Sequence, residues 1–452
     1  MTLRFGTDGV RGVANTELTV ELVTALGRAA VRVLGAEVPF VVGRDTRRSG
    51  PMLEAALVAG ICAEGADVSL AGVLPTPGVA LLAHERAAPA AVISASHNSF
   101  EDNGIKLFAP GGRKIPEHLE TQVEEELRYL ATEIPDTVAA GVAVGVASEH
   151  RNAFDDYVAH LVEALEGRRL DGVTLVIDCG NGAAFRAAPA ALRALGADVD
   201  VLHAAPDGTN INRACGSTDT TELRDAVLLS RASAGLAFDG DADRVIAVDE
   251  KGNEVDGDQM LAVAAIDLHD RGLLRGDTIV ATVMSNLGLR RALEPYGIDL
   301  IETPVGDRNV LDELERRNLA LGGEQSGHVI NTLHSTTGDG TLTGLLLLDT
   351  MVRRRRPLSE LASVMSRVPQ VLRNVAVGNP AALNADATFW NRVRDVDDEL
   401  GDDGRVLVRP SGTEPVVRVM VEAGDAADAD AAATRLVDLV EHAARRSVPA
   451  TP

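Results

Sequence analysis

The feature of this sequence that most constrains its fold is a recurring order of apolar strand, polar glycine-containing loop and helix. In the first cycle, Thr19 is placed to cap a helix over 20–34, and a second helix is expected over 51–64. Buried strands are expected over 38–42, 67–70 and 90–93, with a turn at Pro75-Thr76-Pro77. Strands that alternate with helices favour an α/β layered domain with a largely parallel sheet.

The same order returns twice along the chain and then changes. The strands expected in the second and third cycles cover 173–177, 198–202, 234–238, 278–283, 299–303 and 319–321. After residue 368, two strands over 405–408 and 416–421 precede an amphipathic helix over 428–442, which indicates a smaller α+β domain. Because 452 residues exceed what one hydrophobic core usually supports, we expect a multidomain chain.

The charge balance argues against two classes of partner. With 43 basic and 67 acidic residues, the formal charge of −24 disfavours non-specific binding to nucleic acid or to an anionic membrane. The longest basic run, 353–356, follows an apolar helical stretch and is interpreted as cations at a helix C-terminus. A small anionic substrate remains compatible with this charge if cations gather in a cleft.

Cysteine use and hydropathy predict a cytoplasmic protein. Cys62, Cys179 and Cys215 are odd in number and have no metal-ligand spacing, so we expect no disulfide framework. No apolar run reaches the ~18 residues of a transmembrane helix. The N-terminus also lacks the apolar region of a signal peptide, so neither membrane insertion nor export is expected.

Ser96 follows the expected strand 90–93 in a small polar loop and is a candidate nucleophile. Serine, histidine and asparagine in a loop are more often turn formers, so Ser96 and His97 gain weight only from the loops elsewhere in the chain. His97 is interpreted as an orienting or hydrogen-bonding neighbour. The chain has no recognisable Ser-His-Asp order, and we propose no hydrolase triad.

Three carboxylates, Asp239, Asp241 and Asp243, stand within five residues after the expected strand 234–238. Their mutual repulsion requires a cation, and oxygen-only ligands favour Mg²⁺ or a similar hard ion. An ordinary acidic turn is the alternative interpretation.

The spacing of these carboxylates also imitates a calcium-binding loop, with Glu250 at its twelfth position. However, Arg244 stands where that loop requires glycine, and 245–248 is expected to be a strand. An EF-hand is therefore rejected.

Two further loops carry groups that suit a sugar phosphate. The loop 409–415, with Arg418 beyond it, offers guanidinium groups, hydroxyls and a glycine backbone to a phosphate. The loop 323–328 supplies Glu324, Ser326 and His328, which suit sugar hydroxyls or proton transfer, although a lone histidine is more often structural. Together, the four loops indicate phosphoryl transfer in a cleft between domains.

These motifs resemble those of the α-D-phosphohexomutase superfamily, in the same order and across nearly the whole chain. The motifs are Ser-Ala-Ser-His-Asn at 94–98, Asp-Asn-Gly-Ile-Lys at 102–106, Asp-Gly-Asp-Ala-Asp-Arg at 239–244, Gly-Glu-Gln-Ser-Gly-His at 323–328 and Arg-Pro-Ser-Gly-Thr-Glu-Pro at 409–415. The resemblance implies three similar three-layer α/β domains with mixed sheets and a smaller α+β C-terminal domain around a central cleft. The implied domains cover 1–150, 151–253, 254–368 and 369–452.

Segments 5–12 and 336–340, together with loop 323–328, are most similar to bacterial superfamily members that act on glucosamine phosphates. The resemblance therefore implies interconversion of glucosamine 6-phosphate and glucosamine 1-phosphate, on the route to UDP-N-acetylglucosamine and the cell wall. Ser96 would carry a phosphate and pass it to the sugar, and a sugar 1,6-bisphosphate would be the intermediate. Mg²⁺ would be held by Asp239, Asp241, Asp243 and the phosphate on Ser96.

The resemblance also assigns the remaining groups. Lys106, His328 and Arg11 match family positions near the reacting oxygen, and because arginine is the poorest base, Lys106 or His328 is favoured for proton transfer. The positions implied to contact substrate are His97, Arg244, Gly306, Glu324, Ser326, Arg409, Ser411, Gly412, Thr413 and Arg418, of which the last five would clamp the non-reacting phosphate. A monomer or homodimer is expected, with a small sugar phosphate as its partner.

The chain departs from the family pattern at Ser99, where a proline is usual, at Pro304, and at Asn309, which is commonly aromatic. None of these departures removes a proposed catalytic group, so they bear on rate and selectivity. Two alternatives stay open: a mutase for mannose or glucose phosphates, and a non-catalytic sugar-phosphate-binding protein that needs the clamp but neither Ser96 nor the acidic cluster.

Overall fold

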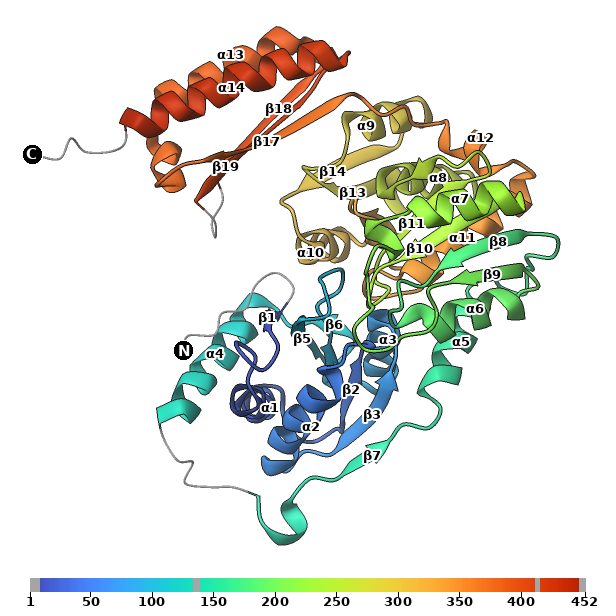
Figure 1. Cartoon of the computed structure of the whole chain (residues 1–452), viewed down its shortest axis with the longest axis vertical. Helices are drawn as coiled ribbons and strands as arrows, with labels where there is room; N and C mark the ends of the chain where they lie inside the picture. The colour runs from blue at the N-terminus through green and yellow to red at the C-terminus, as the bar shows by residue number, and fades with distance from the viewer. Residues whose placement is uncertain (1–8, 133–138, 411–414, 447–452) are drawn as a thin grey trace, which may run out of the picture. The chain divides into compact units, whose positions relative to one another are not determined.

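The computed structural model of the chain describes residues 9–132, 139–410 and 415–446 (Figure 1). The chain divides into two compact units. The first contains Met1–Met284 and Tyr296–Val364, and the second contains Ser285–Pro295 and Met365–Pro452. The finer division at residues 150, 253 and 368 stays a prediction.

The first sheet of the larger unit has the strand order β1-β5-β4-β2-β3-β7, with β6 beside β5. Its strands are β1 (Val10–Val13), β2 (Phe40–Arg44), β3 (Val68–Val73), β4 (Ala90–Ile93), β5 (Asp102–Ala109), β6 (Arg113–Lys114) and β7 (Ala147–Glu149). The central strands pair in parallel, whereas β5 runs antiparallel to β4 and to β1. The sheet is therefore mixed, as the family resemblance implied, and less parallel than the strand and helix order suggested.

Four helices accompany this sheet: α1 (Val20–Leu34), α2 (Gly50–Ala63), α3 (Thr76–Arg86) and α4 (Glu117–Thr132). The Thr19 hydroxyl accepts the Leu22 N–H at 3.3 Å, so the predicted cap of α1 is confirmed. The predicted turn at 75–77 is wrong, because Thr76 and Pro77 begin α3. Proline is well tolerated in the first turn of a helix, where its missing N–H has no intrahelical partner.

The second and third sheets follow with the orders β12-β11-β10-β8-β9 and β14-β13-β15-β16. Their strands are β8 (Thr174–Asp178), β9 (Asp198–Leu202), β10 (Ala234–Phe238), β11 (Val245–Asp249), β12 (Glu254–Val255), β13 (Thr278–Thr282), β14 (Asp299–Thr303), β15 (Leu321–Gly323) and β16 (Val329–Asn331). The helices are α5 (Ala153–Glu163), α6 (Ala184–Ala194), α7 (Thr221–Ser230), α8 (Gly257–Asp270), α10 (Asp307–Arg317), α11 (Gly340–Arg354) and α12 (Leu358–Ala362). Strand β11 confirms that the acidic cluster is not an EF-hand loop.

A continuous apolar core joins the first and second sheets of the larger unit to α8 and α11, whereas β13 and β16 of the third sheet share a separate cluster with α10. Buried side chains from successive parts of the chain, among them Val92, Tyr157, Leu236 and Leu345, belong to one cluster. The Tyr157 hydroxyl donates to Asp339 Oδ1 at 3.0 Å, and Asp339 in turn caps α11 by accepting the Leu342 N–H at 2.9 Å. Because this core is shared, loops from the first and second sheets can be held against one another.

The smaller unit contains a three-stranded antiparallel sheet, in the order β17 (Gln370–Ala376), β19 (Val416–Glu422) and β18 (Arg405–Pro410). Helices α13 (Ala387–Leu400) and α14 (Ala426–Arg446) contribute to its core, and α9 (Leu287–Leu293) also belongs to this unit. The predicted α+β class of the C-terminal region is confirmed.

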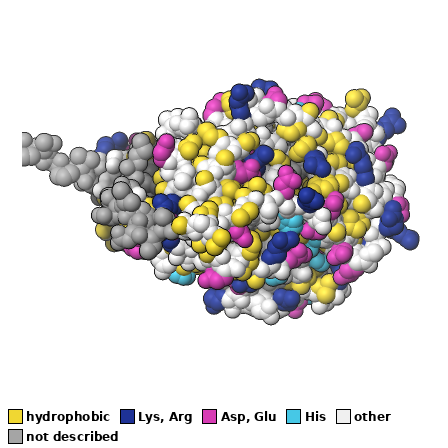
Figure 2. Space-filling view, turned by 90° about the horizontal axis from the view of Figure 1, so that it is seen from below, with side chains coloured by type: hydrophobic (Ala, Val, Ile, Leu, Met, Phe, Trp, Pro, Cys, Tyr) yellow, Lys and Arg dark blue, Asp and Glu magenta, His cyan; other side chains and the backbone are white. Residues whose placement is uncertain are grey.

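The surface bears out the interpretation of the basic run. Arg353 and Arg354 occupy the last turn of α11 and pair with Asp267 at 2.6 and 3.3 Å. On the face drawn in Figure 2, basic and acidic side chains are interspersed. No helix in the described ranges combines the length and the apolar character needed to cross a bilayer.

Candidate active site

Ser96 lies in the loop between β4 and β5, directly after a strand that is buried along its whole length. Its φ of +52° is in the left-handed region, which residues with a side chain rarely adopt. The Ser94 hydroxyl supports this conformation, because it accepts the Ser96 N–H at 2.9 Å and donates to Asp45 Oδ2 at 2.6 Å. The candidate nucleophile is thus held in a defined and strained geometry.

Arg47 anchors the same loop, and sequence reasoning misses it. The side chain is fully buried, and its Nε donates to Asp45 Oδ2 at 2.8 Å. The other guanidinium N–H groups donate to the carbonyl oxygens of Ser96 at 2.8 Å, Asn98 at 2.9 Å, Asp102 at 3.1 Å, and Ser99. All five N–H groups of the guanidinium therefore have acceptors, three of them in the nucleophile loop and one at Asp102, where β5 begins.

The second sheet contributes another support for this loop. The Asn212 side-chain amide donates to the carbonyl oxygens of Ser96 at 2.8 Å and Asn98 at 3.0 Å. A Cβ added at Gly240 would lie 2.4 Å from the Ser96 carbonyl oxygen, so only glycine allows the acidic loop to approach this closely. The two loops are in direct contact.

Asp239, Asp241 and Asp243 follow β10 and are all buried. Ser96 Oγ donates to Asp239 Oδ2 at 2.5 Å, which joins the candidate nucleophile to the acidic cluster. Asp241 Oδ2 accepts from Lys106 Nζ at 2.7 Å and from the Thr76 hydroxyl at 2.6 Å.

The acidic cluster fits a metal ion. One carboxylate oxygen from each aspartate lies within 4.8 Å of the other two. Oδ1 of Asp241 and Oδ1 of Asp243 are buried and accept no hydrogen bond from the described residues. A buried carboxylate oxygen without a donor is costly, and a hard cation would satisfy both oxygens at once.

The pKa values of Asp239 and Asp243 are shifted in opposite directions. Burial, followed by the charges of Asp243 and Asp241, raises the pKa of Asp239 well above its usual value. Burial also opposes ionisation of Asp243, but Lys106, His328 and Arg244 outweigh it and hold the pKa of Asp243 well below the usual range. Of these two carboxyl groups, Asp239, beside Ser96, is therefore the one that takes up a proton more readily.

The predicted proton-transfer candidates lie around this cluster. Lys106 is buried on β5, and its Nζ also donates to Asp243 Oδ2 at 3.2 Å. His328 Nδ1 lies 3.7 Å from Asp243 Oδ1, and its Nε2 accepts the Gly338 N–H at 3.2 Å. Burial lowers the pKa of His328, but the nearby Asp243 carboxylate raises it overall.

Arg11, His97 and Arg244 complete the surroundings of Ser96. Arg11 is on β1, opposite Gly104 of β5. His97 Nδ1 lies 3.5 Å from Ser96 Oγ and 3.3 Å from Arg244 Nη1. Burial lowers the pKa of His97, and the charges of Arg244 and Arg11 add to this, so the imidazole is neutral at pH 7.

The predicted sugar loop lies against the acidic loop. The Val245 N–H donates to the Gly327 carbonyl at 3.2 Å, directly after Arg244. Glu324 is half-buried, and its carboxylate accepts the Gly306 N–H at 3.1 Å and the Ser326 hydroxyl at 3.4 Å. The structure therefore brings Gly306, Glu324 and Ser326 together.

Two of the sequence departures also contact each other. The Asn309 side-chain amide donates to the carbonyl oxygens of Pro304 at 3.3 Å and Val305 at 3.0 Å. Asn309 thereby holds the turn that contains Pro304 and precedes Gly306. The two unusual residues form one local arrangement.

In the smaller unit, the two predicted phosphate-binding arginines face each other. Arg409 on β18 and Arg418 on β19 are direct partners in the antiparallel register. Directly opposed residues place their side chains on the same face of a sheet, where like charges destabilise each other. This pairing suits a bound anion. Ser411, Gly412 and Thr413 lie outside the described residues.

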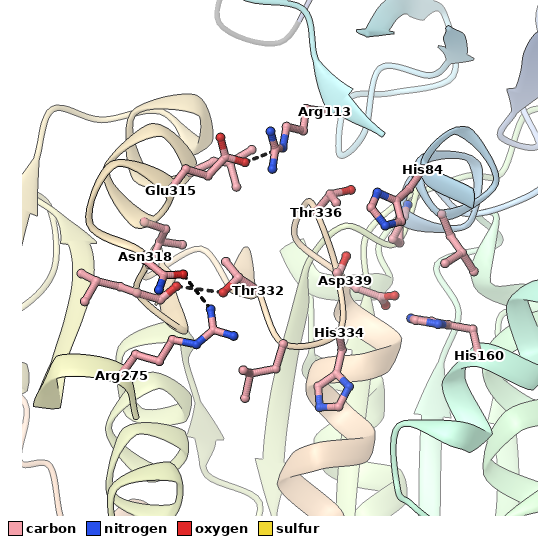
Figure 3. Close-up of a pocket in the computed structure, with 17 residues that line it drawn as sticks. His84, Arg113, His160, Arg275, Glu315, Asn318, Thr332, His334, Thr336 and Asp339 are labelled. Carbon is pink, nitrogen blue, oxygen red and sulfur yellow. Dashed lines mark hydrogen bonds and ion pairs between the residues drawn. The ribbon is translucent and has the colours of Figure 1, made fainter. Parts of the chain in front are cut away.

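A pocket of about 380 Å³ lies elsewhere in the larger unit (Figure 3). Its walls contain none of the predicted site residues. Arg113 and Glu315 form an ion pair at 2.5 Å across it, and Arg275 donates to Asn318 at 3.1 Å. The pocket and the acidic cluster are therefore different places in the unit.

Comparisons with known proteins agree with this geometry. Four domain profiles of the phosphoglucomutase/phosphomannomutase family match the chain: α/β/α domain I at 2–133, domain II at 155–252, domain III at 256–368, and the C-terminal domain at 372–439. The phosphoglucosamine mutase of Streptomyces avermitilis is 51% identical over 447 residues, 97% of this chain and 99% of that protein. That of Salinispora tropica is 52% identical over 449 residues, 97% of this chain and 98% of that protein.

Solved structures show the same fold. A phosphoglucomutase/phosphomannomutase family protein from Burkholderia thailandensis has a TM-score of 0.82 at 27% identity, covering 99% of this chain and 98% of that one. The Aspergillus fumigatus N-acetylphosphoglucosamine mutase in complex with GlcNAc-6P and magnesium has a TM-score of 0.72 at 18% identity, covering 98% of this chain and 96% of that one. The chain therefore belongs to the phosphoglucomutase/phosphomannomutase family, within the α-D-phosphohexomutase superfamily.

Proposed function

We propose that this protein is a phosphoglucosamine mutase, which interconverts glucosamine 6-phosphate and glucosamine 1-phosphate. The observation that carries the chemistry is the 2.5 Å hydrogen bond from Ser96 Oγ to Asp239 inside a buried acidic cluster. The substrate assignment is supported by curated phosphoglucosamine mutases that are about half identical over nearly the full chain.

The reaction consists of two phosphoryl transfers. In the first, the bond between phosphorus and Ser96 Oγ breaks, and a bond to the free 1- or 6-oxygen of the sugar forms as its hydroxyl proton leaves. The resulting 1,6-bisphosphate turns over and returns its other phosphate to Ser96, whose oxygen then replaces the sugar oxygen on phosphorus. The enzyme ends phosphorylated and the sugar isomerised, so no group is gained or lost.

Asp239, Asp241 and Asp243 are the residues that would hold Mg²⁺, together with the phosphate on Ser96. When bound, the ion supplies positive charge where negative charge builds up on the transferring group. Arg47 and Asn212 act through the backbone: they hold the Ser96 loop, so that the nucleophile is already positioned before the substrate binds.

We favour Lys106 over His328 as the proton-transfer partner. Lys106 Nζ reaches two carboxylates of the cluster, one of which, Asp241, is 2.7 Å away. Both ring nitrogens of His328 instead face Gly338 and Asp243, which suits a role in orienting Asp243. Arg11 and His97 would contact the transferring phosphoryl group rather than move its proton.

Glu324 and Ser326 would bind sugar hydroxyls, with Gly306 and Arg244 beside them. Arg409, Ser411, Gly412, Thr413 and Arg418 would bind the non-reacting phosphate. A forked guanidinium suits phosphate oxygens better than a lysine does.

An isomerisation assay with each sugar phosphate tests this function. Wild-type protein should turn over glucosamine phosphate faster than glucose or mannose phosphates, and intact-mass analysis should find one phosphate on Ser96. The Ser96→Ala variant should lose about 10⁴-fold or more in kcat and carry no phosphate. Wild-type rates in Ser96→Ala would reject the mechanism, whereas a preference for mannose or glucose phosphates would reject only the substrate.

A further inference from the structure

A second cluster of metal-binding side chains lies at the ends of β8 and β9, which pair in parallel (Figure 1). Asp178 is the last residue of β8, His203 directly follows β9, and Cys215 comes from the loop before α7. One carboxylate oxygen, one ring nitrogen and the Cys215 sulfur lie within 4.8 Å of one another. Asp178 and Cys215 are fully buried, and Cys215 forms no disulfide.

The Asp178 carboxylate is held in place by the backbone. Oδ1 accepts the Gly180 N–H at 2.8 Å, and Oδ2 accepts the Gly216 N–H at 2.9 Å. Each carboxylate oxygen can accept more than one interaction, so both stay capable of binding a cation. Fixed orientation is what a metal-binding carboxylate requires, since ligating carboxylates are themselves hydrogen-bonded.

His203 has the arrangement expected of a metal-bound imidazole. Its Nε2 lies 3.2 Å from Glu222 Oε2, whereas its Nδ1 lies 3.1 Å from Asp178 Oδ1. Despite that distance, Nδ1 is buried and makes no hydrogen bond to the described residues. The tautomer with its proton on Nε2, the nitrogen nearest Glu222, points a lone pair from Nδ1, and metal-ligating histidines generally direct their other ring nitrogen toward a carboxylate.

We propose that Asp178, His203 and Cys215 form a binding site for a divalent transition metal, with Zn²⁺ as the best match. A set of one oxygen, one nitrogen and one sulfur ligand suits Zn²⁺ and not Mg²⁺, which prefers oxygen alone. Zinc bonds of about 2.0–2.3 Å require the three side chains to move together only slightly. The fourth tetrahedral position is left for water.

The site would act on the nucleophile loop from a distance. His203 and Cys215 bracket the loop that carries Asn212, and Asn212 donates to the Ser96 and Asn98 carbonyls. A metal that ties both ends of this loop to Asp178 restricts the position of Asn212. The metal is therefore structural, and its removal should lower thermal stability more than it lowers activity.

Cobalt substitution tests the site directly. Full-length protein is stripped with a chelator and titrated with Co²⁺ in excess Mg²⁺, which occupies the oxygen-only acidic cluster. Co²⁺ bound to a thiolate gives a sulfur-to-cobalt charge-transfer absorption that oxygen ligands cannot produce. Wild-type protein should show this band, saturating at one Co²⁺ per chain and displaced by Zn²⁺.

Two variants and one matched control make the result specific. Cys215→Ser should abolish the band, whereas Cys179→Ser, which alters the buried cysteine next to Asp178, should keep it. His203→Asn suits the left-handed φ of +47° at this position and should weaken Co²⁺ affinity at least about 10-fold. Zn²⁺ should also raise the Tm of wild type but not of either ligand variant.

The absence of the band from wild type, or its persistence in both Cys215→Ser and His203→Asn, would overturn the proposal. The readout uses no sugar phosphate and leaves Ser96 unchanged. It therefore separates this site from the proposed mutase activity.

Discussion

Two buried clusters at the ends of neighbouring strands differ in what satisfies their carboxylates. Strands β8 and β10 pair in parallel; β8 ends in Asp178, and the acidic cluster that begins at Asp239 directly follows β10. Both oxygens of Asp178 accept backbone N–H groups. In the acidic cluster, Asp241 and Asp243 share the single Lys106 ammonium and leave one oxygen each without a donor.

The difference distinguishes a carboxylate that stabilises the fold from carboxylates that remain available to a ligand. A carboxylate that the backbone satisfies stabilises the loops around it, so its removal should mainly affect stability. Carboxylates that the protein leaves unsatisfied raise the free energy of the folded state, and a bound cation can recover that energy. Substitutions in the two clusters should therefore have opposite profiles.

The largest effect is expected from Asp239→Asn. The amide can still accept from Ser96 Oγ, but it removes a charge that would hold the metal, so kcat should fall by about 10²–10³-fold. The free energy of unfolding without metal should change by less than about 1 kcal/mol, because the substitution also relieves repulsion within the cluster. Steady-state kinetics across Mg²⁺ concentrations and chemical denaturation measure both quantities.

Asp200→Asn, on an exposed position of β9, is the matched control and should alter neither quantity. If Asp239→Asn retained the wild-type kcat, the acidic cluster would not serve the reaction.

Arg47→Lys should lower both stability and kcat, because Arg47 supports the Ser96 loop from outside the acidic cluster. Lysine cannot reproduce five directed N–H groups, so several buried carbonyl oxygens lose their donors. We expect a loss of about 3 kcal/mol in unfolding free energy and of about 10–100-fold in kcat. Denaturation and kinetics of the same preparation check the two values.

Arg44→Lys is the control for that substitution. Arg44 pairs with Glu54 at 3.0 Å and is partly exposed, so its replacement should cost less than about 1 kcal/mol. Equal losses in the two variants would mean that Arg47 has no special role in holding Ser96.

Asp178→Asn should show the reverse of the Asp239→Asn profile. An amide offers one acceptor oxygen, so either the Gly180 or the Gly216 N–H loses its partner, at about 1–3 kcal/mol. The kcat should fall less than about 10-fold, since Asp178 does not contact the acidic cluster or Ser96. A kcat loss as large as that of Asp239→Asn would break the distinction between the two clusters.

The smallest effect is expected from Asn212→Gly. Glycine suits the left-handed φ of +56° and removes only the side chain, whose two carbonyl acceptors Arg47 also serves. We expect about 1 kcal/mol of destabilisation and a few-fold lower kcat, measured as for Arg47→Lys. A larger kcat loss than that of Arg47→Lys would reverse the ranking of these two supports.

The regular elements were largely predictable, because buried strands and amphipathic helices repeat with a local period. The strands 90–93, 198–202, 234–238 and 299–303 and the helix 20–34 match the structure at both ends. Short or exposed elements were not predictable: β7 adjoins the expected domain boundary at residue 150, and it forms by pairing with β3. The start of α3 was also missed, because residues 75–77 were expected to form a turn.

The site divides in the same way. Ser96, the acidic cluster and the sugar loop are contiguous motifs, so they could be found in the sequence. Arg47, Thr76 and Asn212 could not, because their partners are distant in the chain. Thr76 donates to Asp241, and Asn212 contacts the Ser96 loop, through interactions that only folding creates.

By itself, the sequence determined the fold class, the candidate nucleophile and the oxygen-rich cluster, because local period and local motif encode each of them. Only the tertiary structure decided how the Ser96 loop is held and which distant side chains gather at Asp178. Cys215 has no metal-binding spacing in the sequence, yet parallel strand ends and one long loop place it beside His203 and Asp178. Such contacts depend on long-range packing, which no local pattern records.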